Sequence, residues 1–190
     1  MNYLPDKNLG RRSFLRWATH GLGALFGAIL GLPALAYLID ARNRPAPTGE
    51  FKTVARLGEL EINVPKQVVI HDIRRDAWTL HPSDVVGRVW LIRRDRDHVD
   101  AYTTICPHLG CSINFQDGKD PKDRHFVCPC HGGTFHLSCE RVPEHQLGRS
   151  NPAPRGMDKL ETRLDPANPE LLQVKYRNFI QGKETAVPKV

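Results

Sequence analysis

The chain has 190 residues, 40% of them hydrophobic, which allows one domain of ordinary size with an appendage and excludes a multidomain enzyme. Fifteen Gly and fifteen Pro favour short elements joined by turns over a helical bundle. The formal net charge of +6 comes mainly from residues 1–44, and residues 45–190 hold no basic run or basic–aromatic patch, so we expect no nucleic-acid partner.

The N-terminal part predicts a membrane anchor. Residues 17–39 contain no Asp, Glu, Lys or Arg, and a helix of this length measures about 35 Å, enough to cross a hydrocarbon core of about 30 Å. We therefore expect one transmembrane helix over 17–39. The polar segment 40–50, with Pro45 and Pro47, predicts a flexible tether leading to a body over 51–190.

Residues 1–16 predict an orientation. The run Arg11-Arg12-Ser13-Phe14-Leu15 resembles a twin-arginine export signal, or else supplies only the positive charge that keeps a flank in the cytoplasm. Both interpretations place the N-terminus in the cytoplasm and the body outside a bacterial inner membrane. A cleaved signal peptide is a third possibility, but Ile39-Asp40-Ala41-Arg42 is a poor cleavage site, so we expect a retained single-pass anchor.

The body predicts a mainly β fold. Short runs of β-branched and aromatic residues recur between turn residues, and no stretch of the body carries a convincing helical stripe. The predicted strands are 61–64, 68–70, 88–92, 99–103, 125–127 and 171–176. Two charged segments, 93–97 and 117–124, are expected to be solvated turns.

Four of the five cysteines fall in two motifs, Cys106-Pro107-His108-Leu109-Gly110-Cys111 and Cys128-Pro129-Cys130-His131-Gly132-Gly133. Thiolate and imidazole ligands suit an iron–sulfur cluster or zinc. Structural zinc sites usually place two to four residues between paired ligands, whereas one residue separates Cys106 from His108. The spacing therefore favours iron and leaves zinc as the alternative.

These two motifs resemble the Rieske [2Fe–2S] signature, in which two histidines replace two cysteines on one iron. The resemblance implies that Cys106 and Cys128 bind one iron and that His108 and His131 bind the other. It also implies an antiparallel β-sandwich head with a two-loop cluster-binding subdomain over about 104–156.

The remaining pair, Cys111 and Cys130, matches the disulfide that joins the two cluster loops in Rieske proteins of quinol-oxidising cytochrome complexes. Such a bridge is expected outside the cytoplasm, in agreement with the predicted orientation. The segment 148–156 is similar to the family's Gly-Pro-Ala-Pro loop that shields the cluster. Pro152 and Pro154 occupy its proline positions, and Asn151 stands where glycine is usual.

The resemblance implies an electron-transfer subunit of a quinol–cytochrome c oxidoreductase, with cytochrome b and a c-type cytochrome as partners. Quinol gives up an electron and a proton at the Rieske centre, and the electron passes to the c-type cytochrome. By analogy His131 is the quinol-facing ligand and His108 the second exposed imidazole. Leu109 is expected either to shape the docking surface or to act only as an apolar lid.

The sequence departs from many high-potential members of the family in the residues around the cluster. Those members carry Ser and Tyr hydroxyls that bond to sulfur, and here Gly133 and Phe135 stand in their places. The loss of each bond lowers a one-electron potential by about 60 mV if the bond contributes about 1.4 kcal/mol. We therefore expect a low-potential centre suited to menaquinol, unless the Thr134 hydroxyl restores one bond.

Cys139 is unpaired in this scheme and has no assigned role. Two other functions stay open at this point. The chain could be the Rieske small subunit of another exported oxidoreductase such as arsenite oxidase, or a membrane-tethered zinc-binding interaction module.

Overall fold

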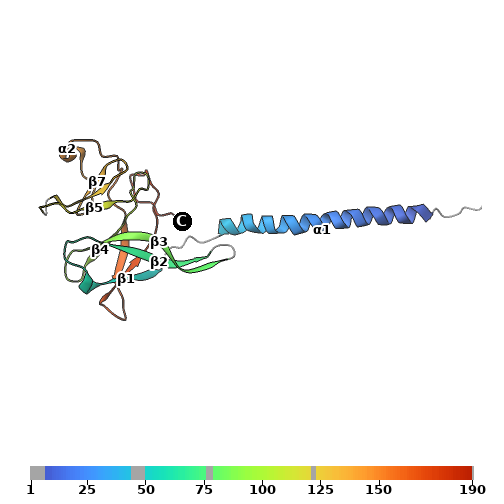
Figure 1. Ribbon diagram of the computed structural model, residues 1–190, viewed down its shortest axis with the longest axis horizontal. Helices are drawn as coiled ribbons and strands as arrows, with labels where there is room; N and C mark the ends of the chain where they lie inside the picture. The colour runs from blue at the N-terminus through green and yellow to red at the C-terminus, as the bar shows by residue number, and fades with distance from the viewer. Residues whose placement is uncertain (1–6, 44–49, 76–78, 121–122, 190) are drawn as a thin grey trace, which may run out of the picture. The chain divides into compact units, whose positions relative to one another are not determined.

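The computed structural model describes residues 7–43, 50–75, 79–120 and 123–189, which belong to two compact units, 1–45 and 46–190. The first unit contains one helix. The second contains two antiparallel sheets and a short helix (Figure 1).

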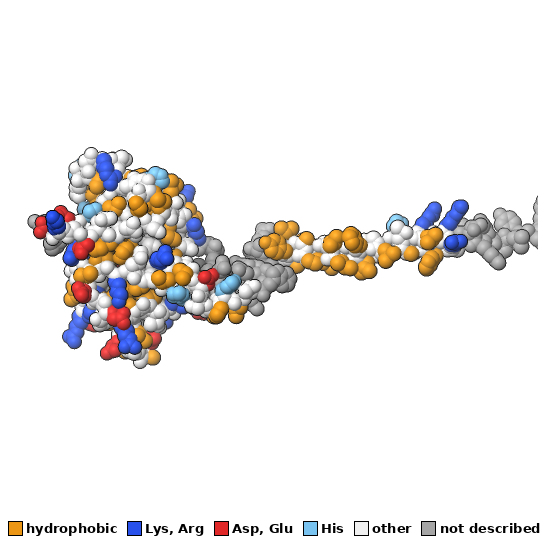
Figure 2. Space-filling view, viewed as in Figure 1, with side chains coloured by type: hydrophobic (Ala, Val, Ile, Leu, Met, Phe, Trp, Pro, Cys, Tyr) orange, Lys and Arg blue, Asp and Glu red, His pale blue; other side chains and the backbone are white. Residues whose placement is uncertain are grey.

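Helix α1 (Lys7–Asn43) contains a segment of 30 residues, Gly10–Ile39, that is long and apolar enough to cross a membrane. Hydrophobic side chains run along it, and its basic side chains gather near the N-terminal end (Figure 2). The helix passes the expected end at Ile39 because residues 40–43 contain neither Gly nor Pro, and Pro45 is the first helix breaker that follows. The first residues of the expected tether are therefore helical, and its residues 44–49 lie outside the described ranges.

The base of the second unit is a six-stranded antiparallel sheet in the order β1-β9-β8-β4-β3-β2. Strands β1 and β2 at its two edges contact each other, which gives the sheet a near-barrel shape. Alternate side chains point inward, as a period of two requires, and the core includes Val89, Leu91, Leu172 and Val174. The strands are β1 (Phe51–Arg56), β2 (Lys66–Arg75), β3 (Leu80–Arg93), β4 (Val99–Thr103), β8 (Lys159–Leu164) and β9 (Leu171–Lys175).

The sequence-based prediction of a strand at 61–64 was wrong. Asn63 adopts a positive φ of 59°, and its N–H donates to the Arg93 carbonyl at 2.8 Å. This turn leaves Ile62 with only an isolated parallel bridge to Arg93, because a left-handed residue interrupts the extended backbone that a ladder needs. The other five predicted runs lie mainly or wholly in strands.

A smaller three-stranded sheet stands at one end of this unit (Figure 1). Strands β5 (Asn114–Gln116), β6 (His125–Cys128) and β7 (Gly133–His136) pair antiparallel in that order, and the one-turn helix α2 (Glu144–Leu147) follows β7. Phe126 and Phe135 are fully buried here. The Trp90 ring from the base sheet packs edge-on against the Phe126 ring, with 5.4 Å between the ring centroids. This second core joins the two sheets and holds the loops between β4 and β5 and between β6 and β7.

Candidate metal centre

Two turns of the same form carry the cysteine and histidine motifs. In the first, the Gly110 N–H donates to the Cys106 carbonyl at 2.9 Å, and in the second the Gly132 N–H donates to the Cys128 carbonyl at 3.0 Å. Gly110 and Gly132 have φ values of 84° and 74°, a region that glycine enters without steric cost. Each turn therefore begins at a cysteine and curves tightly through the histidine that follows.

The four predicted ligands form an inner and an outer layer. The side chains of Cys106 and Cys128 are buried, at 1% and 2% exposure, whereas His108 is half-buried and His131 is exposed. The two imidazole rings lie 5.0 Å apart between centroids and nearly perpendicular, at 86°. The structure thus brings all four residues to one end of the domain, with the thiols inside and the imidazoles outward.

The environment of Cys106 fits a metal ligand. Burial raises the pKa of its thiol to about 12, backbone N–H groups of His108 and Leu109 act in the opposite direction, and the neighbouring Cys128 raises the pKa further. A thiolate in such a place is stable only beside a cation, which a bound metal supplies. Two buried thiols and two outward imidazoles are the donor set of a [2Fe–2S] cluster with two histidine ligands.

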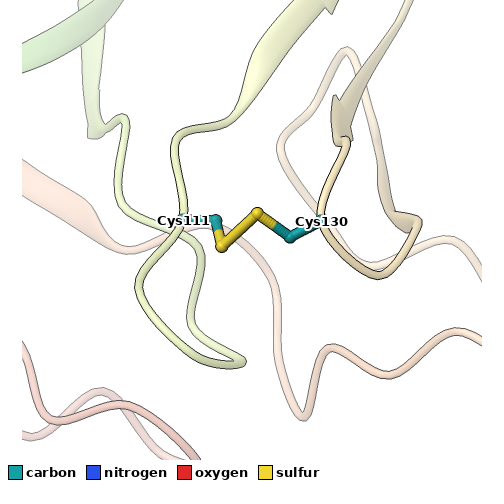
Figure 3. The surroundings of a disulfide bond; sticks show 2 residues. All are labelled: Cys111 and Cys130. Carbon is teal, nitrogen blue, oxygen red and sulfur yellow. A yellow bond between two sulfur atoms is a disulfide. The ribbon is translucent and has the colours of Figure 1, made fainter.

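Cys111 and Cys130 form a disulfide that links the two turns (Figure 3). Their Cα atoms are 6.5 Å apart, and 19 positions separate them in the sequence. The sulfur atoms of Cys111, Cys128 and Cys130 lie within 4.8 Å of one another. The disulfide removes two of these three sulfurs as thiolate donors. Of the three, only the Cys128 sulfur therefore remains available to a metal.

Gly133 lies directly behind the two buried thiols. A Cβ atom at this position would stand 3.6 Å from the Cys106 sulfur, 3.6 Å from Cys128 Cβ and 3.7 Å from Ala153 Cβ. These are ordinary van der Waals distances, so the site has room for a small side chain although the residue itself supplies none. Phe135, which faces Phe126 across the β6–β7 ladder, supplies no hydroxyl either.

The hydroxyl of Thr134 bonds away from sulfur. Its Oγ1 donates to the Gly132 carbonyl at 3.0 Å and accepts from Arg149 Nη2 at 3.0 Å. A hydroxyl has a single proton, so this pair of bonds leaves none for a cluster sulfur. Thr134 therefore does not replace the hydroxyl bonds absent at Gly133 and Phe135.

Asn151 joins the proline loop to β7. Its side-chain amide donates to the carbonyls of Thr134 at 2.8 Å and Val142 at 2.9 Å, and its Oδ1 accepts from the N–H groups of Thr134 and Ala153 at 3.3 Å. Pro152 and Pro154, on either side of Ala153, are half-buried. A glycine at position 151, the residue expected from the resemblance, could make none of these side-chain bonds, so Asn151 has a structural role here.

A segment outside the predicted site also supports the first turn. Residues 177–189, called the C-terminal strap below, pass beside it, and the Gly182 N–H donates to the Pro107 carbonyl at 2.8 Å. Arg155 bonds through its guanidinium to the carbonyls of Ile180 and Lys183 and to the buried Asp158 carboxylate. The strap is thereby tied both to the proline loop and to the turn that carries His108.

The remaining predicted residues lie as follows. Leu109 is 64% exposed at the tip of the first turn. Cys139 is buried and adopts a positive φ of 68°; burial raises the pKa of its thiol to about 12, and its charged neighbours are Arg94, Asp100 and Lys159. Its sulfur contacts the Leu137 carbonyl at 3.9 Å, so Cys139 belongs to the base of the subdomain and not to the paired turns.

Sequence reasoning missed the arginines of the site. Arg141 donates to the Ala153 and Asn151 carbonyls, both at 2.6 Å, and Arg149 and Arg155 make the contacts described above. No spacing rule marks an arginine that bonds to backbone carbonyls of a distant loop. The one sequence signal near these arginines was Asn151, which stands in the proline loop where the resemblance places a glycine.

The Rieske [2Fe–2S] domain family matches residues 50–152. Curated relatives include the menaquinol:cytochrome c reductase iron–sulfur subunits of Geobacillus thermodenitrificans and Bacillus subtilis (strain 168), both 28% identical to this chain. The two alignments cover 70% and 72% of this chain, and 76% and 78% of the relatives. The cytochrome b6-f complex iron–sulfur subunit of Chlorobaculum thiosulfatiphilum is 24% identical over 85% of this chain and 75% of its own. Among solved structures, the plasma membrane Rieske protein of Synechocystis PCC 6803 has 21% identity and a TM-score of 0.37, covering 58% of this chain and 86% of its own.

Proposed function

The chain belongs to the Rieske [2Fe–2S] family, and we propose that it is the membrane-anchored electron-transfer subunit of a quinol:cytochrome c reductase. It accepts an electron and a proton from quinol, with menaquinol as the favoured donor, and passes the electron to a c-type cytochrome. The observation that carries this proposal is the layering of the site, in which buried thiols lie behind imidazoles that reach the surface.

Cys106 and Cys128 hold one iron and His108 and His131 the other. When bound, the cluster supplies a one-electron acceptor. Each liganding imidazole has a second ring nitrogen that can hold or release a proton, which makes histidine the side chain suited to couple proton and electron uptake near neutral pH. The exposure of His131 supports its role as the imidazole that accepts a hydrogen bond from quinol. The ring of half-buried His108 lies 5.0 Å from the His131 ring, measured between centroids, and is the second liganding imidazole.

Leu109 forms the apolar contact with cytochrome b at the quinol site. A leucine that remains 64% exposed beside the two imidazoles covers little of the domain itself, which supports a docking role over that of a lid. Contact with the partner protein buries this side chain and excludes water from the imidazole–quinol hydrogen bond.

Menaquinol is favoured because two hydroxyl bonds that would stabilise the reduced, more negative cluster are missing at positions 133 and 135. Gly133 and Phe135 carry no hydroxyl, and the Thr134 hydroxyl donates to the Gly132 carbonyl. A low reduction potential matches a strongly reducing quinol. The name given to the two Bacillus-type relatives, which describes them as subunits of menaquinol reductases, agrees with this proposal.

The anchor places the head outside a bacterial inner membrane. Arg11, Arg12 and Arg16 lie at the N-terminal end of the apolar segment of α1, which supports a cytoplasmic N-terminus. Arg11 and Arg12 act in addition as a twin-arginine export signal, so that the head crosses the membrane already folded. Replacing both with lysine is expected to block export of the holoprotein while leaving the uncharged residues 17–39 unchanged.

The proposal is tested on the detergent-solubilised full chain purified from its own membrane. We expect iron and acid-labile sulfide in equal amounts, a Rieske EPR signal, and co-purification of b- and c-type haem. The potential is expected to be low and to fall as the pH rises, because the proposed reduction takes up a proton together with the electron. Zinc without an EPR signal would overturn the assignment, and a Rieske signal without b-type haem would favour another exported oxidoreductase.

Single substitutions test the ligand set. Cys106→Ser and Cys128→Ser are expected to abolish the Rieske signal, because serine is a poor ligand for this iron. Cys139→Ser is the matched control, since it removes the third buried free thiol at a place away from the paired turns. Loss of the signal in the control alone would contradict the assignment.

A further inference from the structure

Helix α2 ends in a turn that directs an arginine back over the second cysteine turn. Gly148 follows α2 with φ 67°, and its N–H donates to the Glu144 carbonyl at 2.9 Å. The left-handed residue reverses the chain, so that Arg149 leaves the helix toward β7.

The Arg149 guanidinium lies against the backbone of Gly132, the residue after His131. A Cβ atom built on Gly132 would stand 2.7 Å from Arg149 Nη1 and 3.2 Å from its Cζ. Arg149 Nη2 also donates to Thr134 Oγ1 at 3.0 Å, and Thr134 Oγ1 in turn donates to the Gly132 carbonyl. The guanidinium is therefore held at the turn that spans Cys128 to Gly133.

The charge of Arg149 is not neutralised by these contacts. Its described acceptors are the Thr134 hydroxyl and the Ser150 carbonyl, both of them neutral. The carboxylate of Glu144, on the adjoining helix, is bound by Arg141 at 3.0 Å. A full positive charge thus stands beside the turn that carries His131.

We propose that Arg149 raises the reduction potential of the centre through its charge, and so offsets part of the loss caused by the missing hydroxyls at 133 and 135. This inference rests on the proposed function, because it requires the cluster to be bound by the two turns. Reduction makes the cluster more negative, and a nearby positive charge stabilises the reduced form relative to the oxidised one. A partly exposed charge acts through an effective dielectric constant of about 20 or more, so we expect this equilibrium to change by a few-fold.

The test is a redox titration of the EPR signal in the solubilised full-length holoprotein. In Arg149→Gln, the ratio of reduced to oxidised centre at the wild-type midpoint potential is expected to fall about fourfold, equivalent to about 35 mV for one electron. Arg149→Lys keeps the charge and is expected to restore most of the potential. Arg163→Gln, which removes an arginine that stacks on Phe51 in the base sheet, is the matched control and is expected to leave the potential unchanged.

Two further measurements separate charge from loop geometry. Thr134→Val removes the hydroxyl anchor but keeps the charge, so its potential is expected to lie closer to wild type than that of Arg149→Gln. Because salt screens exposed charges, the difference between wild type and Arg149→Gln is expected to shrink as ionic strength rises.

An unchanged potential in Arg149→Gln, with a normal Rieske signal, would overturn this inference and leave the proposed function standing. An equal fall in Arg149→Gln and Arg149→Lys would also overturn it, because loop geometry and not charge would then be responsible. Absence of a Rieske signal from the wild-type holoprotein would overturn the proposed function and the inference together.

Discussion

The backbone N–H of Gly182 donates to the carbonyl of Pro107 at 2.8 Å, so the C-terminal strap is bonded to the turn that presents His108. The strap lies outside the matched family region, which ends at residue 152. It reaches the turn because Arg155, in the proline loop between α2 and β8, bonds to two of its carbonyls. The first turn is thus supported by the strap as well as by the disulfide.

Replacing Arg155 is expected to loosen the first turn. In Arg155→Met the strap loses two hydrogen bonds and Asp158, which is 4% exposed, loses its partner, at a cost of about 3 kcal/mol in the free energy of unfolding. Hydrogen exchange should rise in the peptide that holds residues 106–111, and iron should be lost faster to a chelator. Adding Asp158→Asn to Arg155→Met removes the unpaired charge but does not restore the strap bonds. The double variant should therefore recover stability without recovering slow exchange. Unchanged exchange in Arg155→Met would contradict a role for the strap.

Gly133→Ser is expected to raise the reduction potential. The structure accommodates a Cβ atom there at 3.6 Å from the Cys106 sulfur, and a serine hydroxyl on that atom has sulfur within reach. One added hydrogen bond that favours the reduced state by about 1.4 kcal/mol corresponds to about 60 mV for one electron. Voltammetry of the holoprotein measures the shift. Gly133→Ala adds the same Cβ without the hydroxyl, and an equal rise in that variant would show that bonding to sulfur is not the cause.

Removing the disulfide is expected to weaken the site more than the rest of the domain. The double substitution of Cys111 and Cys130 by alanine opens a loop closed over 19 positions, which corresponds to about 3 kcal/mol in the chain-entropy model. The urea midpoint should fall, and the cluster should bleach at a lower urea concentration than that at which the base sheet unfolds. Wild type treated with a thiol-free reductant serves as the matched control and should behave like the double variant. Coincident bleaching and unfolding in both would contradict a local role.

Asp100 is expected to stabilise the fold at neutral pH and to lose that effect in acid. Burial opposes its ionisation, yet hydrogen bonds from Lys159 at 2.6 Å and Arg94 at 2.8 Å hold its pKa below the ordinary value of an aspartate. A carboxyl whose pKa is lowered by folding contributes stability above its unfolded pKa, and that contribution disappears as the pH falls through the folded pKa. Asp100→Asn should cost about 2 kcal/mol at neutral pH.

The same measurement at lower pH checks the sign. The difference in unfolding free energy between wild type and Asp100→Asn should stay constant from neutral pH to about pH 5 and shrink below about pH 4. Lys52 and Asp72 form a similar surface pair on the edge of the base sheet, so Asp72→Asn tests whether the effect requires burial. A difference that grows in acid would contradict the assignment.

The resemblance of the two motifs predicted the residues of the candidate metal centre, and the short spacing within each motif explains why each cysteine and its histidine lie in one turn. One residue separates Cys106 from His108 and two separate Cys128 from His131, so a tight turn brings the members of each pair to one side. The mainly β fold was predictable for a similar reason, since alternation such as that of Leu172 and Val174 is written into neighbouring residues. The strand expected at 61–64 failed because Asn63 adopts a left-handed conformation that no local pattern announced.

By itself the sequence determined the apolar helix, the two motifs and the absence of hydroxyls at 133 and 135, because each of these is a property of residues close together in the chain. Only the tertiary structure decided the use of the Thr134 hydroxyl, the place of Arg149 over Gly132 and the bond from the strap to Pro107. Apart from the bond of Thr134 to Gly132, these contacts join segments far apart in sequence through single polar groups. Their formation depends on how the two sheets pack, and hydrogen bonds of this kind leave no periodic trace in the chain.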